Sequence, residues 1–135
     1  LSDDLAAQLG TIDVVNSAYP AGVRVYRVSV NVQRFESWPG QRAALDAVWS
    51  VRAIGSQAVM TCRTSVAEPV AGGYDALVVG HRRAIGALAG RIAAGVRAME
   101  ESHALGAATA SPSRTAATGI SSGKSPAPVW PCRNR

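Results

Sequence analysis

His81 is the residue of this sequence best suited to chemistry, because an imidazole that titrates near neutral pH can act as a general base. A catalytic histidine also needs a nucleophile and an orienting acid within hydrogen-bond reach. The available partners are Asp75, six residues earlier on the same expected helix, and the distant Cys62. Neither spacing builds a triad. We therefore interpret His81 as a helix residue packed at the edge of a sheet, with one ring nitrogen hydrogen-bonded.

Two other features could suggest chemistry. Asp46 is a lone carboxylate among apolar residues, whereas acid–base hydrolysis of the glycosidase type uses a pair. Gly72-Gly73 is a loop hinge, because it lacks the GxxxxGK[ST] and GxGxxG spacings that cradle a phosphate. We therefore expect no catalytic residue, no cofactor and no metal ion, and we predict that the protein is not an enzyme.

The aromatic residues point to packing and to contact with a partner. Trp49 is expected to fill the core beneath a long helix, and Phe35 could stack on a ligand. Trp38 precedes Pro39 at the tip of an expected turn, and exposed aromatic side chains are favoured at interfaces. Trp38 is therefore the candidate for partner contact. The alternative is an isolated exposed apolar residue, which is common in proteins.

The two cysteines leave two possibilities open. Free cysteine usually behaves as a small hydrophobic residue, so we interpret Cys62 as a buried thiol and Cys132 as an incidental one. A disulfide between them would require an oxidising compartment and an ordered C-terminal segment. The sequence does not decide whether they pair.

The positive charge is concentrated near the C-terminus. The chain has a formal net charge of +5. Residues 1–103 contain ten basic and nine acidic residues, net +1, and residues 104–135 contain four basic residues and no acidic ones, net +4. A folded nucleic-acid binder should have its basic face on the domain itself, so we expect no nucleic-acid partner.

The elements that would position these residues follow from hydrophobic periodicity. We expect a short helix, an edge strand, three longer strands and a long helix, over residues 2–10, 11–15, 23–36, 42–52, 57–67 and 74–101, respectively. The three longer strands would pair as an antiparallel meander with one buried face. Ser2 would cap the first helix and Gly10 would end it. A change of phase in the first long strand predicts either a β-bulge near Tyr26-Arg27 or a twisted strand with both faces half-buried.

The long helix has an apolar stripe at three- and four-residue spacing. Its members are Leu77 or Val78, His81, Ile85, Leu88, Ile92, Val96 and Met99. Gly86, Gly90 and Ala94 form a row of small residues that would let a sheet or a helix approach closely. After His103 the composition becomes rich in Ala, Ser, Thr, Gly and Pro, so we predict a folded domain over 1–103 and a low-complexity, disordered tail over 104–135.

An ordered set of motifs resembles one protein family. The set is Arg34-Phe35, Pro39-Gly40, Leu45-Asp46-Ala47-x-Trp49, Glu68-Pro69, Tyr74-Asp75-Ala76-Leu77-Val78 with His81, and Leu88-Ala89-x-x-Ile92-Ala93. It is similar to the PqiC-like auxiliary lipoproteins of ABC-type and MCE-type lipid transport systems, over roughly residues 2–99.

The resemblance implies a fold, a location and a set of partners. The fold would be an α/β three-layer sandwich around a mixed sheet, with this chain contributing the meander and the long C-terminal helix. An N-terminal portion, including a lipidated cysteine, would be missing. The protein would be periplasmic and attached to the outer membrane through a lipid anchor absent from this chain. It would act as an adaptor or cap on an MCE-family transport protein, serve membrane integrity, and form a homo-oligomer.

Two other functions remain open from the residues. One is a small hydrolase that uses His81, which requires an accessible imidazole with a partner group within hydrogen-bond reach. The other is an anionic-surface binder that works through the basic tail, residues 104–135.

Overall fold

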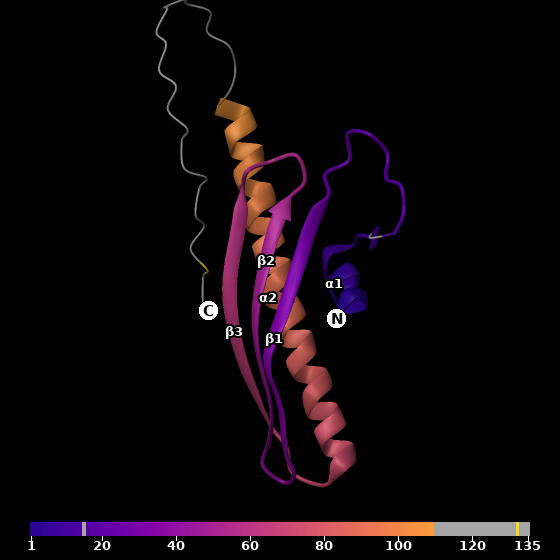
Figure 1. Ribbon diagram of the computed structural model, residues 1–135, viewed down its shortest axis with the longest axis vertical. Coiled ribbons are helices and arrows are strands. Elements are labelled where there is room, and N and C mark those ends of the chain that lie inside the picture. The colour runs from indigo at the N-terminus through magenta and orange to yellow at the C-terminus, as the bar shows by residue number, and fades with distance from the viewer. Residues whose placement is uncertain (15, 110–131, 133–135) are drawn as a thin grey trace, which may run out of the picture.

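Three antiparallel strands form the sheet at the centre of the molecule (Figure 1). The computed structural model describes residues 1–14, 16–109 and 132. Its strands are β1 (Tyr26–Trp38), β2 (Arg42–Ala53) and β3 (Val59–Pro69), in the spatial order β1-β2-β3. The α/β class and the antiparallel meander with a long C-terminal helix are confirmed. The described residues form two layers, the sheet and the helices on one of its faces.

Strand alternation gives the sheet one buried face. Along β2, the side chains of alternate residues from Ala43 to Ala53 are buried, and those between them are more exposed, apart from Ala44. The register pairs Trp49 with Val30 of β1 and with Cys62 of β3, so these three residues share the buried face. We call the opposite side of the sheet, which carries residues such as Arg52, the open face.

The β-bulge lies further along β1 than expected. The register between β1 and β2 shifts between Val32 and Arg34, which leaves Gln33 as the extra residue. The strand begins at Tyr26, so Val23 and Val25, which gave the first phase of the predicted strand, lie in the preceding loop. The predicted bulge near Tyr26-Arg27 is therefore wrong. The strand also continues through Trp38, and Gly40, with φ of 70°, takes the left-handed conformation that closes the hairpin.

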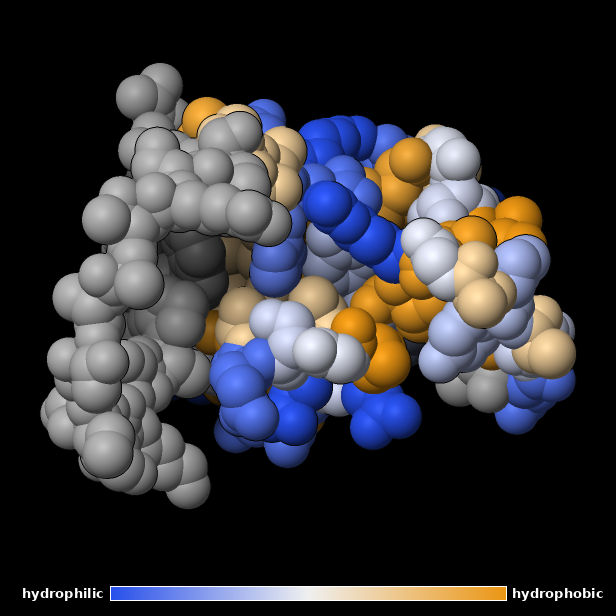
Figure 2. Space-filling model, turned by 90° about the horizontal axis from the view of Figure 1, so that it is seen from above, coloured by the Kyte–Doolittle hydropathy of each residue, from blue (hydrophilic) through white to orange (hydrophobic). Residues whose placement is uncertain are grey.

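The long helix α2 (Tyr74–Thr109) packs on β2 and β3 (Figure 1). Its buried stripe contains the predicted Leu77, Leu88, Ile92, Val96 and Met99. Val78 is half exposed and does not belong to the stripe. Viewed along the long axis, hydrophobic residues lie between two hydrophilic margins (Figure 2), as expected for a core enclosed by two amphipathic layers.

Two glycines outside the predicted small-residue row allow α2 to approach the sheet. A Cβ atom at Gly95 would lie 2.9 Å from Cη2 of Trp49. A Cβ atom at Gly80 would lie 2.7 Å from Cγ2 of Val70. The indole Nε1 of buried Trp49 in turn donates a hydrogen bond to Oγ1 of Thr64 at 3.0 Å. The expected position of Trp49 beneath the long helix is confirmed.

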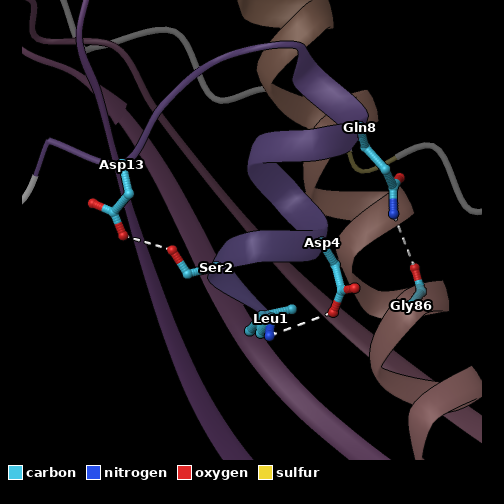
Figure 3. Close-up of polar contacts among 6 residues, drawn as sticks. All are labelled: Leu1, Ser2, Asp4, Gln8, Asp13 and Gly86. Atoms are coloured by element: carbon cyan, nitrogen blue, oxygen red, sulfur yellow. Dashed lines mark hydrogen bonds and ion pairs between the residues drawn. The ribbon is translucent and has the colours of Figure 1, made fainter.

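The short helix α1 (Ser2–Leu9) packs beside α2, where its Gln8 lies against Gly86 and Gly90 of the predicted row of small residues. Gln8 points at α2 and donates a hydrogen bond to the carbonyl oxygen of Gly86 (Figure 3). Leu5 and Leu9 pack against the main core. Gly10 ends the helix in the left-handed conformation, as predicted.

Two expectations about the N-terminal segment are wrong. Ser2 does not cap α1, because its hydroxyl donates to Oδ2 of Asp13 at 2.5 Å (Figure 3). The described residues 11–14 form no strand, and Val15 lies outside the described residues.

Cys62 and Cys132 form a disulfide, which corrects the interpretation of two free thiols. Their Cα atoms are 5.7 Å apart, and 70 positions separate them in the sequence. Cys62 lies on β3, which has no strand on its outer side among the described residues. Cys132, although remote in sequence, can therefore reach the sulfur atom of Cys62. The residues around each cysteine do not indicate this pairing.

The C-terminal helix continues past the predicted domain end. It runs through Thr109, beyond His103. Residues 110–131 and 133–135, most of the predicted tail, lie outside the described residues. None of the helices that the structure describes combines the length and the hydrophobicity required to cross a membrane.

Gly95→Ala should lower the free energy of unfolding by about 1–3 kcal/mol, because the added methyl group would overpack the core against Trp49. Gly86→Ala in the same helix is the matched control. A Cβ atom there meets nothing within 4 Å, and alanine favours helix over glycine by about 1 kcal/mol. Urea denaturation should show opposite shifts for the two variants. A neutral Gly95→Ala would contradict the packing described.

Cys132→Ala should lower the free energy of unfolding by about 2–4 kcal/mol, because the disulfide constrains the unfolded chain. The variant leaves buried Cys62 in place, so no cavity opens in the core. Denaturation with and without dithiothreitol provides the control. The reductant should destabilise the wild type and leave the variant unchanged. Equal stability of the two proteins without reductant would contradict a stabilising role for the bond.

Candidate functional site

The β1–β2 hairpin places the candidate residues on opposite faces of the sheet. Successive side chains of a strand point to opposite faces. Phe35 and Ser37 therefore lie on the side of α2, and Glu36 and Trp38 lie on the open face, as their register partners on β2 confirm. The residues nearest to one another in sequence thus belong to two different environments.

On the helix side, Phe35, Ser37 and His81 form a contiguous cluster. The His81 ring stacks on the Phe35 ring with centroids 4.1 Å apart and an interplanar angle of 24°. The Nε2 atom of His81 is 2.8 Å from Oγ of Ser37. The Nδ1 atom is buried and has no hydrogen-bond partner among the described residues. The interpretation of His81 as a packed helix histidine with one satisfied nitrogen is confirmed.

The structure nevertheless places a hydroxyl beside His81, where the sequence suggested no nucleophile. A hydroxyl–imidazole pair resembles two members of a catalytic triad. For Nε2 to accept the Ser37 proton, Nδ1 must carry the other ring proton. That N–H would be buried without an acceptor, which is costly. The described residues provide no acceptor for that N–H, so none of them supports the tautomer in which the ring could activate the hydroxyl.

The predicted helpers of His81, Cys62 and Asp75, are engaged elsewhere or lie apart from it, as do two acids of the sheet. Cys62 is oxidised in the disulfide. Asp75 lies exposed in the first turn of α2. Asp46 and Glu36 lie on the open face, where both carboxylates pair with Arg34 at 3.8 Å and 3.6 Å. Nothing in the described residues places an orienting acid at Nδ1 of His81.

Trp38 is the last residue of β1, on the open face, and its indole ring contacts the guanidinium group of Arg42. The guanidinium carbon of Arg42 lies 4.4 Å from the centroid of the indole ring, within the range of a cation–π interaction. The two residues are register partners across the hairpin. Trp38 is consequently part-buried rather than freely exposed at a turn tip. The sequence reading missed Arg42, although its position directly after the hairpin turn could have indicated the pair.

Tyr26 has a perturbed pKa and lies at the other end of β1. Burial raises the pKa of its hydroxyl above the ordinary value, the negative charge of Glu100 raises it further, and Arg24 partly opposes both.

The described residues contain no group of three or more His, Cys, Asp or Glu side chains that could hold a metal ion. Of the proposed basic tail, Arg114, Lys124, Arg133 and Arg135 all lie outside the described residues.

Comparison with known proteins gives one match. A protein-family model described as "ABC-type transport auxiliary lipoprotein component" matches residues 1–93. This range contains α1, the entire sheet and the first part of α2. No curated protein and no solved structure matches the chain.

His81→Phe should leave the free energy of unfolding within about 1 kcal/mol of the wild type. The phenyl ring can keep the stacking on Phe35, the exposed hydrogen bond to Ser37 contributes little, and the unpaired buried nitrogen disappears. His81→Ala should lose the stacking contact and be less stable than His81→Phe. Thermal denaturation measures both.

Ser37→Ala tests the hydrolase interpretation directly. Because no described acid supports the tautomer that would activate the hydroxyl, hydrolysis of p-nitrophenyl acetate by the wild type, Ser37→Ala and His81→Phe should proceed at equal rates. An ester hydrolysis rate that falls at least tenfold in both variants would assign a catalytic dyad to this cluster.

Proposed function

Because the chain belongs to the family of ABC-type transport auxiliary lipoprotein components, we propose that it acts without catalysis as an adaptor or cap in a lipid transport system that links the inner and outer membranes. The family match over 1–93 is the observation that carries the proposal. The proposed partner is an MCE-family transport protein, whose tunnel this domain would contact through its surface.

The disulfide supports a periplasmic location. Disulfides persist in oxidising compartments such as the bacterial periplasm and are rare in the cytosol. The bond between Cys62 and Cys132 joins the edge of the sheet to the C-terminal segment, so it is part of the described fold. We further propose that a lipid anchor attaches the protein to the outer membrane.

Two surfaces are available for assembly. Trp38, held under Arg42 at the hairpin, is the proposed contact with the transport partner. Val32 and Phe35, which are 51% and 54% exposed at the β1 margin on the helix side, supply apolar area for self-association. Homo-oligomerisation is proposed on this basis, because exposed apolar side chains that lie together mark interaction sites.

Trp38→Ala should weaken capture of the MCE-family protein about tenfold or more, because Trp is enriched among the interface residues whose truncation costs about 2 kcal/mol or more. The assay is affinity capture with the tagged full-length lipoprotein from envelope extracts, with the MCE-family protein quantified by mass spectrometry. Tyr74→Ala is the matched control, since it truncates an aromatic side chain that is 81% exposed on α2, in the helix layer. Absence of the MCE-family protein from the wild-type capture would overturn the proposed function.

A further inference from the structure

The open face has a polar, exposed region at the end of the sheet away from the β1–β2 hairpin. Cross-strand pairing arranges its side chains in three adjacent rows. The rows are Arg27–Arg52–Val59, Ser29–Ser50–Thr61 and Asn31–Val48–Arg63. A row of three hydroxyls therefore lies between two rows that contain arginines, and these hydroxyl residues line a shallow hollow.

The arginines of these rows have no acidic partner among the described residues. The two acids of the open face, Glu36 and Asp46, both lie near Arg34, at 3.6 Å and 3.8 Å. Arg42, beyond them, rests on Trp38. No ion pair of the described residues includes Arg27, Arg52 or Arg63, and all three are exposed. This end of the face thus presents three positive charges that no described acidic residue pairs.

The arrangement of two of these charges is unfavourable in isolation. Arg27 and Arg52 are direct register partners on neighbouring strands, and their side chains leave the same face. Like charges directly opposite one another destabilise a sheet. A carboxylate bound between them would remove this repulsion and gain charge-assisted hydrogen bonds from both guanidinium groups.

The spacing of the charges indicates a ligand larger than one small anion. Arg63 of β3 pairs with Val48 of β2, and Val48 lies four residues from Arg52 along β2. At about 3.4 Å per residue, the two positive positions are separated by about 14 Å along the strand. The hydroxyls of Ser29, Ser50 and Thr61 span the interval and can donate hydrogen bonds. An extended, multiply charged acidic surface matches this pattern.

We call this part of the open face the arginine face; it comprises Arg27, Arg52, Arg63 and the hydroxyl row between them. We propose that the arginine face docks on an acidic protein surface of the transport partner. This inference rests on the proposed function and specifies the chemistry of its interface. The three arginines would attract carboxylates on the partner, and such charge complementarity supports the proposal. A protein is favoured over a membrane surface because none of the large exposed hydrophobic residues lies in these rows, whereas binding at a membrane interface requires buried apolar area.

Arg27→Glu/Arg52→Glu tests the proposal. In a binding assay between the full-length lipoprotein and the purified MCE-family protein, this variant should raise Kd more than tenfold. The wild-type Kd should rise between 50 and 300 mM NaCl, and the variant should lose that dependence, because the removed attraction is electrostatic. The double change replaces one like-charge pair with another, so differences in folding stability should be small.

Arg82→Glu/Arg91→Glu is the matched control. Both residues are exposed on α2, in the other layer, and the variant makes the same change of net charge. It should bind within about twofold of the wild type. A Kd that rises equally in the two double variants would show that net charge, and not the arginine face, controls binding, and would overturn the inference.

Two further results separate this inference from its alternatives. Failure of the wild type to bind the MCE-family protein would overturn the proposed function and this partner assignment with it. Unchanged binding by Arg27→Glu/Arg52→Glu would overturn this inference alone. Cosedimentation with phosphatidylglycerol vesicles, if lost in this variant while protein binding is retained, would assign the face to a membrane surface and would also overturn it.

The single variant Arg27→Glu adds an independent readout. It places a glutamate opposite Arg52 and converts a repulsive pair into an attractive one. The melting temperature should therefore rise while affinity for the partner falls. A parallel fall of both quantities would indicate structural damage and would contradict the assignment of these arginines to binding.

Discussion

The close approach of α2 to the sheet at Gly95 is the contact on which the rest of the structure depends. A three-stranded sheet has little stability unless one face is covered. Trp49 supplies the largest side chain of that face, and the helix can lie on it only because Gly95 has no side chain. The hydrogen bond from the indole to Thr64 satisfies the one polar atom that this burial would otherwise leave unpaired. The long helix α2 thus covers most of one face of the sheet, and no described element covers the opposite face.

The division into a covered and an open face decides what the hairpin residues can do. Phe35 and Ser37 belong to the covered side, where they hold the His81 ring in one position. The same packing leaves Nδ1 buried without a partner among the described residues, so none of them supports the tautomer that hydrolysis would need. Trp38, one residue further, belongs to the open face with the arginines. The chemical candidates therefore serve packing, and the surface groups remain available for a partner.

This organisation agrees with membership in a transport-auxiliary family. A binding module needs a rigid surface with unsatisfied charge or apolar area, and the arginine face and the margin of β1 provide both. The disulfide joins the opposite edge of the sheet to the C-terminal segment. The proposed partner contact, the proposed surface for self-association and the disulfide thus lie at separate places on one small sheet.

Local sequence determined the elements, and tertiary structure determined which residues meet. The alternation in the strands and the three- and four-residue spacing in the long helix depend on neighbours within a few positions, so the meander, the helix and the burial of Trp49 could be predicted. The bulge at Gln33, the contact of Ser37 with His81 and the pairing of Cys62 with Cys132 could not. Each depends on residues brought together by strand register or by remote segments of the chain. The opposition of Arg27 and Arg52 has the same origin: the sequence supplies two arginines, and only the register places them side by side.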